Sequence, residues 1–185
     1  MHLLERFAHH VRQQNWLGIE DDLETLLATI SIESSLELCL HQARNFLPLA
    51  EYYLPTHTWM RHTLQLIEKD MSTSDIMLAR IPRNAFNTDV TLSLESFSDG
   101  LNFLLIAYKN RSDSDIFLRK ISIALQHFVS ASIAEFAGAR YPRQWTLVKV
   151  QGMVERHVSK LDDPVRRYQQ SLWWNVFDYI ARFQT

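Results

Sequence analysis

Apolar residues recur every three or four positions over the N-terminal part of the chain. This period predicts helices over residues 2–14, 20–30 and 31–47, and Pro48 is expected to end the third of them. Ser31 precedes the third apolar stripe and is expected to cap that helix. The beginning of the chain is therefore expected to be helical.

The pattern changes after Pro48. Residues 59–68 alternate in part between apolar and polar side chains, and residues 75–81 end just before Pro82. Residues 89–96 alternate cleanly, and Asp-Gly separates them from a second apolar run at 101–108. Asp-Gly between two apolar runs is typical of a β-hairpin. The middle of the chain is therefore expected to form an antiparallel sheet.

The same region also fits one face of a helix. That face would consist of Leu94, Phe97, Leu101, Leu104, Leu105 and Tyr108. We favour the hairpin because Gly100 inside a helix costs roughly 1 kcal/mol relative to Ala. The alternation over residues 89–96 also favours an extended chain.

The C-terminal half is expected to be helical again. Apolar spacing predicts helices over residues 113–138, 144–159 and 163–183, and the first of these has the broadest apolar stripe. We expect residues 144–183 to form a helical pair that docks on the helix at 113–138 or pairs with another subunit. This divides the chain into a domain at 1–141 and a C-terminal helical extension at 142–185.

The order of these elements resembles a GAF-type sensory domain over about residues 20–141. Two short helices within Leu26–Leu47 carry the first part of the resemblance. The segment Val90–Arg140 carries the second part, with an alternating strand, Asp-Gly, an apolar strand, an acidic helix start and a long helix that ends near Ala-Arg. The resemblance is one of element order.

The resemblance implies an α+β fold, in which a GAF-like antiparallel sheet is flanked by helices and followed by the C-terminal helical pair. An all-α bundle is the alternative. The connections at 70–74 and 82–88 are short, so a pocket of cyclic-nucleotide size is not expected. The implied function is a non-catalytic regulatory or signalling module that acts through protein contacts and self-association, as a homodimer, with a small ligand as an optional addition.

Charge is divided unevenly along the chain. The net charge is −2, but residues 1–100 hold 14 acids and 7 bases, a balance of −7, and residues 101–185 hold 7 acids and 12 bases, a balance of +5. Residues 15–37 hold six acids and no Lys or Arg. Nucleic acid is not expected as a partner because its binders are usually strongly basic. The acidic segment supports an alternative function, a small helical inhibitor or immunity-type protein that binds and blocks a partner.

The chain shows no sequence motif of an enzyme or of a cofactor site. It lacks a Gly-rich phosphate loop and the common hydrolase and metalloprotease motifs, so we expect no enzymatic activity, no cofactor and no metal. Glu33, Glu37 and His41 share one helix side, but we interpret them as a solvated stripe. We expect Cys39 to be a small buried hydrophobic residue. No signal peptide or membrane span is visible, so the expected location is the cytoplasm.

Two groups of residues are candidates for binding. Arginine next to aromatic side chains suits an anion or a partner protein, and the candidates of this type are Trp59, Arg61, His62, Arg80 and Arg83. Tryptophan and arginine are also enriched at the centres of interfaces. The interface candidates in the C-terminal extension are Trp145, Arg166, Trp173, Trp174 and Phe177.

Overall fold

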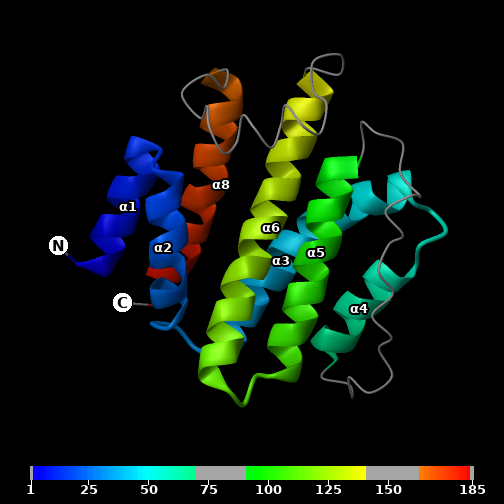
Figure 1. The fold of residues 1–185 in the computed structure, drawn as a ribbon, viewed down its shortest axis with the longest axis horizontal. Helices are drawn as coiled ribbons and strands as arrows, with labels where there is room; N and C mark the ends of the chain where they lie inside the picture. The colour runs from blue at the N-terminus through cyan, green and yellow to red at the C-terminus, as the bar shows by residue number, and fades with distance from the viewer. Residues whose placement is uncertain (1, 70–90, 141–162, 184–185) are drawn as a thin grey trace.

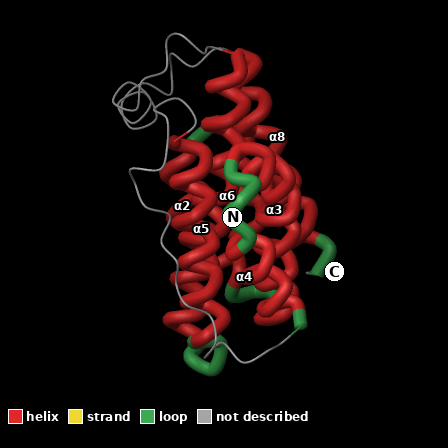
Figure 2. The backbone as a smooth tube through the Cα atoms, turned by 90° about the vertical axis from the view of Figure 1, so that its right-hand side faces the viewer, coloured by secondary structure: helices red, strands yellow, loops and turns green. Residues whose placement is uncertain are grey.

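Every regular element in the described part of the chain is an α-helix. The computed structural model describes residues 2–69, 91–140 and 163–183 (Figure 1), and Figure 2 shows no strand among them. The helices are α1 (Leu3–Gln13), α2 (Trp16–Leu27), α3 (Ile32–Tyr53), α4 (Trp59–Glu68), α5 (Thr91–Lys109), α6 (Ser114–Arg140) and α8 (Asp163–Ala181). The expected α+β fold with a GAF-like sheet is therefore wrong, and the all-helical alternative fits.

Helix α6 lies at the centre of the bundle (Figure 1), where α2, α3, α5 and α8 all pack against it. Helix α1 packs on α2 and α8, and α4 packs on α3 and α5. The core includes a row of aromatic rings in which Phe97 of α5 lies between Phe46 of α3 and Phe128 of α6, with ring centroids 4.9 and 5.7 Å apart. None of the described helices is both long and apolar enough to span a membrane.

The expected hairpin at residues 89–108 is instead helix α5 from Thr91 onward. Its buried face is the one that the helical alternative named, and each of these residues is at most 3% exposed: Leu94, Phe97, Leu101, Leu104, Leu105 and Tyr108. Burial of a large apolar side chain contributes about 1.5–3 kcal/mol. Six such residues outweigh the local preference for an extended chain.

Gly100 has a role that the local pattern did not reveal. A Cβ atom at this position would lie 2.6 Å from Cε1 and 2.8 Å from Cδ1 of Phe128, and 3.2 Å from Cβ of His127. The missing side chain therefore lets α5 approach α6 closely. The glycine costs helix propensity, but it permits the packing that holds the two helices together.

The alternating segment at residues 59–68 is also helical. It forms α4, and the residues that it buries are Met60, Thr63, Leu64, Leu66 and Ile67. His62, which a strand would place on the same face as Met60, is exposed. The expected strand at 75–81 lies outside the described residues.

Helix α3 begins where expected and continues past the expected end. The Ser34 N–H donates to Ser31 Oγ at 3.0 Å, which confirms the predicted cap. Pro48 lies inside the helix, which ends at Tyr53. Proline inside a helix costs about 3 kcal/mol because it lacks an N–H. The buried Leu47 and Ala50 on either side of Pro48 offset this cost.

The two C-terminal helices within the described residues confirm the sequence prediction. Helix α6 matches the predicted 113–138, although Ile116, placed in its buried stripe, is 40% exposed. Helix α8 matches the predicted 163–183 and docks on α6 and α1. Phe7 of α1 contacts Trp173 edge to face and stacks on Phe177, each with centroids 6.4 Å apart. The predicted helix at 144–159 lies outside the described residues.

Candidate functional site

Helix α2 presents an acidic stripe to solvent. Asn15 caps the helix, since its Oδ1 accepts a hydrogen bond of 3.2 Å from the Gly18 N–H. The inner positions are fully buried: Ile19, Leu23, Leu26 and Leu27. The opposite side carries four exposed residues at helical spacing, which we call the α2 outer face: Leu17, Glu20, Asp21 and Glu24.

Asp22 departs from the acidic face that the sequence predicts. It is 4% exposed and turns inward, where it accepts a bidentate hydrogen bond from the Arg6 guanidinium of α1. The Arg6 Nε to Asp22 Oδ2 distance is 2.9 Å, and His10 Nε2 lies 3.7 Å from the same oxygen. Both partners belong to α1, so their pairing with Asp22 depends on tertiary structure. This polar contact joins α1 to α2.

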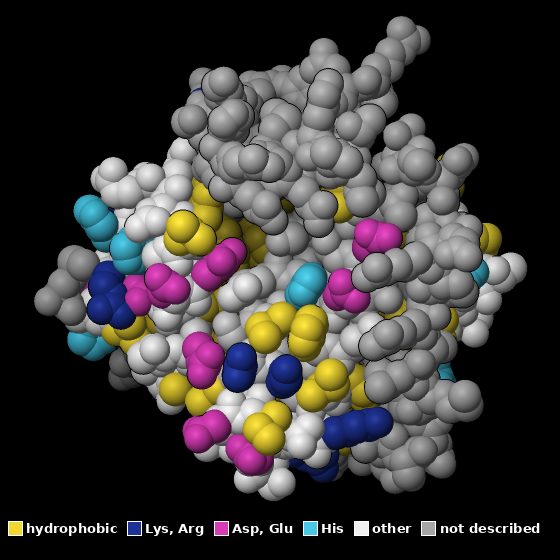
Figure 3. All heavy atoms as spheres, viewed as in Figure 1, with side chains coloured by type: hydrophobic (Ala, Val, Ile, Leu, Met, Phe, Trp, Pro, Cys, Tyr) yellow, Lys and Arg dark blue, Asp and Glu magenta, His cyan; other side chains and the backbone are white. Residues whose placement is uncertain are grey.

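The carboxylates of the α2 outer face are not paired with a cation from the described part of the chain. Among the described residues, Glu20, Asp21 and Glu24 form no ion pair. Desolvation of its carboxyl group and the neighbouring charge of Asp21 both raise the pKa of Glu20. Figure 3 shows acidic side chains over the part of the surface where α2 lies in Figure 1. Such crowding of like charge is relieved when a cation approaches.

Leu17 adds an apolar group to this stripe. Its exposed fraction of 74% is among the largest of the big hydrophobic side chains in the described residues. It lies three positions before Glu20 and seven before Glu24, so all three share one side of the helix. The α2 outer face thus has an apolar side chain at its N-terminal end and three carboxylates after it.

Of the candidate binding residues on α4, Arg61 forms a contact that joins this helix to α3. Arg61 pairs with Glu51 of α3 through two hydrogen bonds of 2.7 and 2.5 Å, and this pairing lowers the pKa of Glu51. Trp59 is partly buried and packs against the main core, while His62 is exposed. Arg80 and Arg83 lie outside the described residues.

The predicted interface residues on α8 pack largely within the chain. Trp173 is 4% exposed, and the Trp174 ring packs edge to face on Phe177 at 5.1 Å. The Arg12 guanidinium of α1 lies over the Trp174 ring, 5.6 Å from its centroid. Arg166 is partly buried near the start of α8, and Trp145 lies outside the described residues.

The structure also locates the residues considered for metal binding and thiol chemistry. Glu37 accepts a hydrogen bond of 2.9 Å from Arg44, and His41 Nε2 lies 3.3 Å from Asn45 Nδ2. Among the described residues, no three His, Cys, Asp or Glu side chains are arranged to hold a metal ion. Cys39 is fully buried, as predicted, and burial raises the pKa of its thiol.

The α2 outer face is the site on which a function can be argued, because its charges are unpaired within the described chain. Comparisons with protein-family models, with curated proteins and with solved structures found no match. The function proposed below therefore rests on the residues of this chain.

Proposed function

We propose that this chain is a small helical binding protein that blocks a partner protein by covering a basic surface on it. The α2 outer face makes the contact. One observation carries the proposal: Leu17, 74% exposed, shares a helix side with three carboxylates that form no ion pair among the described residues. The proposed role is non-catalytic, and it agrees with the acidic segment seen at residues 15–37.

The two parts of the face contribute differently to binding. The carboxylates attract a basic partner over several ångströms, which speeds association and selects the partner by charge. Burial of the Leu17 side chain contributes about 1.5–3 kcal/mol and slows dissociation. The complementary partner surface is an apolar pocket bordered by Lys and Arg.

The rest of α2 suits this role because it holds the face rigidly. The inner side chains are packed into the core, and Asp22 joins α2 to Arg6 of α1. A preorganised face loses little conformational freedom when a partner binds. The structure of α2 therefore favours direct docking without rearrangement of the helix.

The experiment uses a matched pair of charge reversals. The 185-residue chain is immobilised, bound proteins are identified, and their association rates are measured for wild type, Glu24→Lys and Glu95→Lys. Both variants change the charge equally, but Glu95 is on α5. We expect Glu24→Lys to slow association tenfold or more, Glu95→Lys to change it less than twofold, and added salt to slow the wild type.

Leu17→Ala tests the apolar part. We expect a dissociation rate about tenfold faster with an unchanged melting temperature, because the side chain touches solvent in the free protein. If the two charge reversals have equal effects on every captured protein, the α2 outer face is not the contact surface and the proposal fails.

Self-association is a second proposal, and the division of charge favours it. Residues 1–100 carry a balance of −7 and residues 101–185 a balance of +5, so the acidic part of one copy attracts the basic part of another. Light scattering at low and high salt tests it. A dimer that dissociates in salt supports this proposal, and a monomer at all concentrations contradicts it.

A further inference from the structure

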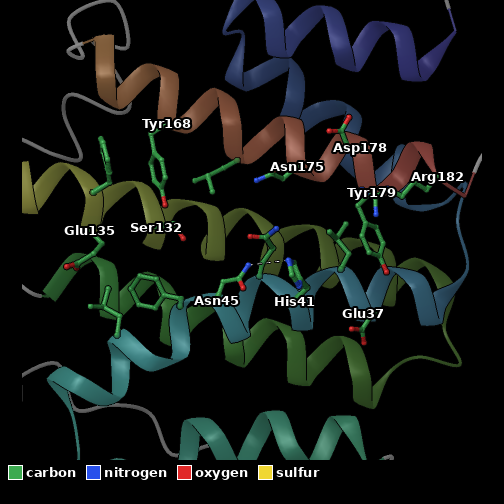
Figure 4. Close-up of a pocket in the computed structure, with 16 residues that line it drawn as sticks. Glu37, His41, Asn45, Ser132, Glu135, Tyr168, Asn175, Asp178, Tyr179 and Arg182 are labelled. Carbon is green, nitrogen blue, oxygen red and sulfur yellow. Dashed lines mark hydrogen bonds between the residues drawn. The ribbon is translucent and has the colours of Figure 1, made fainter.

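A groove runs between α3 and α8, with α6 as its floor. It encloses a cavity of about 750 Å³, which is within the size range of ligand sites. Figure 4 shows Asn45 and His41 extending from α3 toward the gap and Asn175 and Tyr179 extending from α8 on the other side. We call this the α3–α8 groove. It is separate from the α2 outer face.

Gln42 is the residue that points to a ligand. It is 8% exposed and lines the groove, and its carboxamide forms no hydrogen bond with any described residue. Because Gln42 lines the cavity, its amide is open to a molecule in the groove and lacks a partner among the described residues that would compete for its hydrogen bonds. A molecule that occupies the groove can therefore bond this amide.

Two other carboxamides line the same groove. Asn45 lies three positions after Gln42 on α3, and Asn175 is on the facing side of α8. Each carboxamide offers both a donor and an acceptor, as a peptide group does. Amides on both walls therefore suit a ligand that presents N–H and C=O groups along its length.

The charges of the groove restrict the ligand further. Three carboxylates line it, those of Glu37, Glu135 and Asp178, against Arg182 and His41, and Glu37 is already paired with Arg44 at 2.9 Å. Glu135 accepts hydrogen bonds from the hydroxyls of Tyr53 at 2.9 Å and Ser93 at 3.0 Å, which are neutral donors. This balance disfavours nucleotides and other anions and favours a ligand with positive charge.

Aromatic side chains complete the lining at one end. Phe136 of α6 and Tyr168 of α8 stack with centroids 4.4 Å apart, and both border the cavity. Such rings bind the alkyl part of a lysine or arginine side chain and attract its charge. The groove thus offers amides for a main chain, and carboxylates and rings for basic side chains.

We propose that the α3–α8 groove binds an extended peptide segment that carries Lys or Arg. Its lining runs from Glu37 to Leu49 along α3, about 18 Å at 1.5 Å per residue. An extended chain advances about 3.3 Å per residue, so the groove holds roughly six residues. This proposal goes beyond the proposed function, because it concerns another face and a linear ligand.

The test uses labelled hexapeptides with blocked ends and the whole 185-residue chain. One pool has Lys fixed at two positions and random residues elsewhere, and the other has Glu at the same two positions. Fluorescence anisotropy measures binding. We expect the Lys pool to bind at least tenfold more tightly than the Glu pool, and Asp178→Asn to reduce this difference.

Variants of the amides locate the binding. Gln42→Leu keeps the side-chain volume and removes the unpaired amide, so we expect an unchanged or higher melting temperature with about tenfold weaker peptide binding. Asn175 is exposed, so we expect Asn175→Ala to weaken peptide binding without changing the melting temperature. Glu95→Lys, on α5 and outside the groove lining, serves as the charge control and leaves peptide binding unchanged, and Glu24→Lys reports whether the peptide uses the α2 outer face instead.

Three results would overturn the proposal. They are a failure of both pools to bind, full affinity in both Gln42→Leu and Asn175→Ala, and a loss in Glu24→Lys as large as in Gln42→Leu. The last result moves the peptide to the α2 outer face. The proposed function is contradicted by a different result, namely equal effects of Glu24→Lys and Glu95→Lys on partner association. The two proposals can therefore fail independently.

Discussion

Gly100→Ala is expected to destabilise the protein, although alanine is the better helix former. The substitution adds a methyl group where α5 meets α6. The new carbon would lie 2.6 Å from Cε1 of Phe128, a distance at which something must shift. Phe128 is 1% exposed and packs against Phe97, so its ring has little room to move.

The expected change in the free energy of unfolding follows from two opposing contributions. Replacing glycine by alanine inside a helix stabilises it by about 1 kcal/mol. Forcing an extra methyl group into a packed core costs about 1–3 kcal/mol. The steric cost wins, and we expect a net loss of roughly 1 kcal/mol in the free energy of unfolding, or about 2–4 °C in melting temperature for a chain of this size.

Gly138 supplies the matched control. It is in α6, and a Cβ atom there would meet nothing within 4 Å. Gly138→Ala should therefore stabilise the protein by up to about 1 kcal/mol. Urea denaturation followed by circular dichroism at 222 nm measures both variants. If Gly100→Ala stabilises the protein as much as Gly138→Ala does, the close contact between α5 and α6 is not there.

A double-mutant cycle identifies the clash partner. Phe128→Leu shortens the side chain that faces Gly100. In that background Gly100→Ala should cost less than in the wild type, with a coupling energy of at least about 0.5 kcal/mol. Additive effects of the two substitutions would mean that Phe128 does not limit the approach of the helices.

Three further predictions concern single side chains. Asp22→Asn should lower the melting temperature more than Glu51→Gln does, because Asp22 is buried and the Glu51 pair lies at the surface; equal shifts in calorimetry would contradict this. Burial lowers the pKa of His127, which the charge of Asp99 partly opposes, so the fold favours neutral imidazole and loses stability as the pH falls through 6.5. His127→Phe should reduce the difference in unfolding free energy between pH 7.5 and pH 5.5, and an unchanged difference would exclude this cause. The buried thiol of Cys39 should resist iodoacetamide in the folded protein and react after unfolding, as mass spectrometry can measure.

The elements predicted correctly from the sequence are those whose local signals agree. Ser31 caps α3 as predicted. At the start of α6 the capping side chain is Asp113, which accepts a hydrogen bond of 3.1 Å from the Ile116 N–H, one position after Ser112, which the sequence favoured as the cap. In α6 and α8 the apolar period agrees with the start signals, so local and tertiary preferences point to the same structure. Start signals and apolar stripe together were enough to place the beginnings of these helices, whereas α3 continues to Tyr53, past its expected end.

The errors arose where tertiary packing overrides a local signal. Gly100 and Pro48 were interpreted as breaks in secondary structure, but both lie inside helices. At Gly100 the reason is the contact with Phe128, which is 28 positions away in the sequence. A local pattern contains no information about that contact, so the helical face that ends at Tyr108 was recognised only as an alternative.

The candidate surfaces differ in how far the sequence could indicate them. The acidic segment at residues 15–37 was visible, and it led to the α2 outer face. The α3–α8 groove was not predictable, because its walls are more than 100 positions apart in the sequence and neither contains a motif. Gln42 is an ordinary polar residue in the sequence and becomes informative only when its burial is known.

Helix α2 departs twice from the usual distribution of apolar and polar side chains, and the two departures have different consequences. Asp22 faces the interior, where the Arg6 guanidinium compensates its charge. Leu17 faces solvent, and no described residue covers it. A compensated departure stabilises the fold, whereas an uncompensated one leaves free energy to be gained by binding. Three carboxylates, unpaired within the described residues, lie on the same side of the helix as Leu17. A basic protein surface is therefore the partner whose binding gains the most free energy.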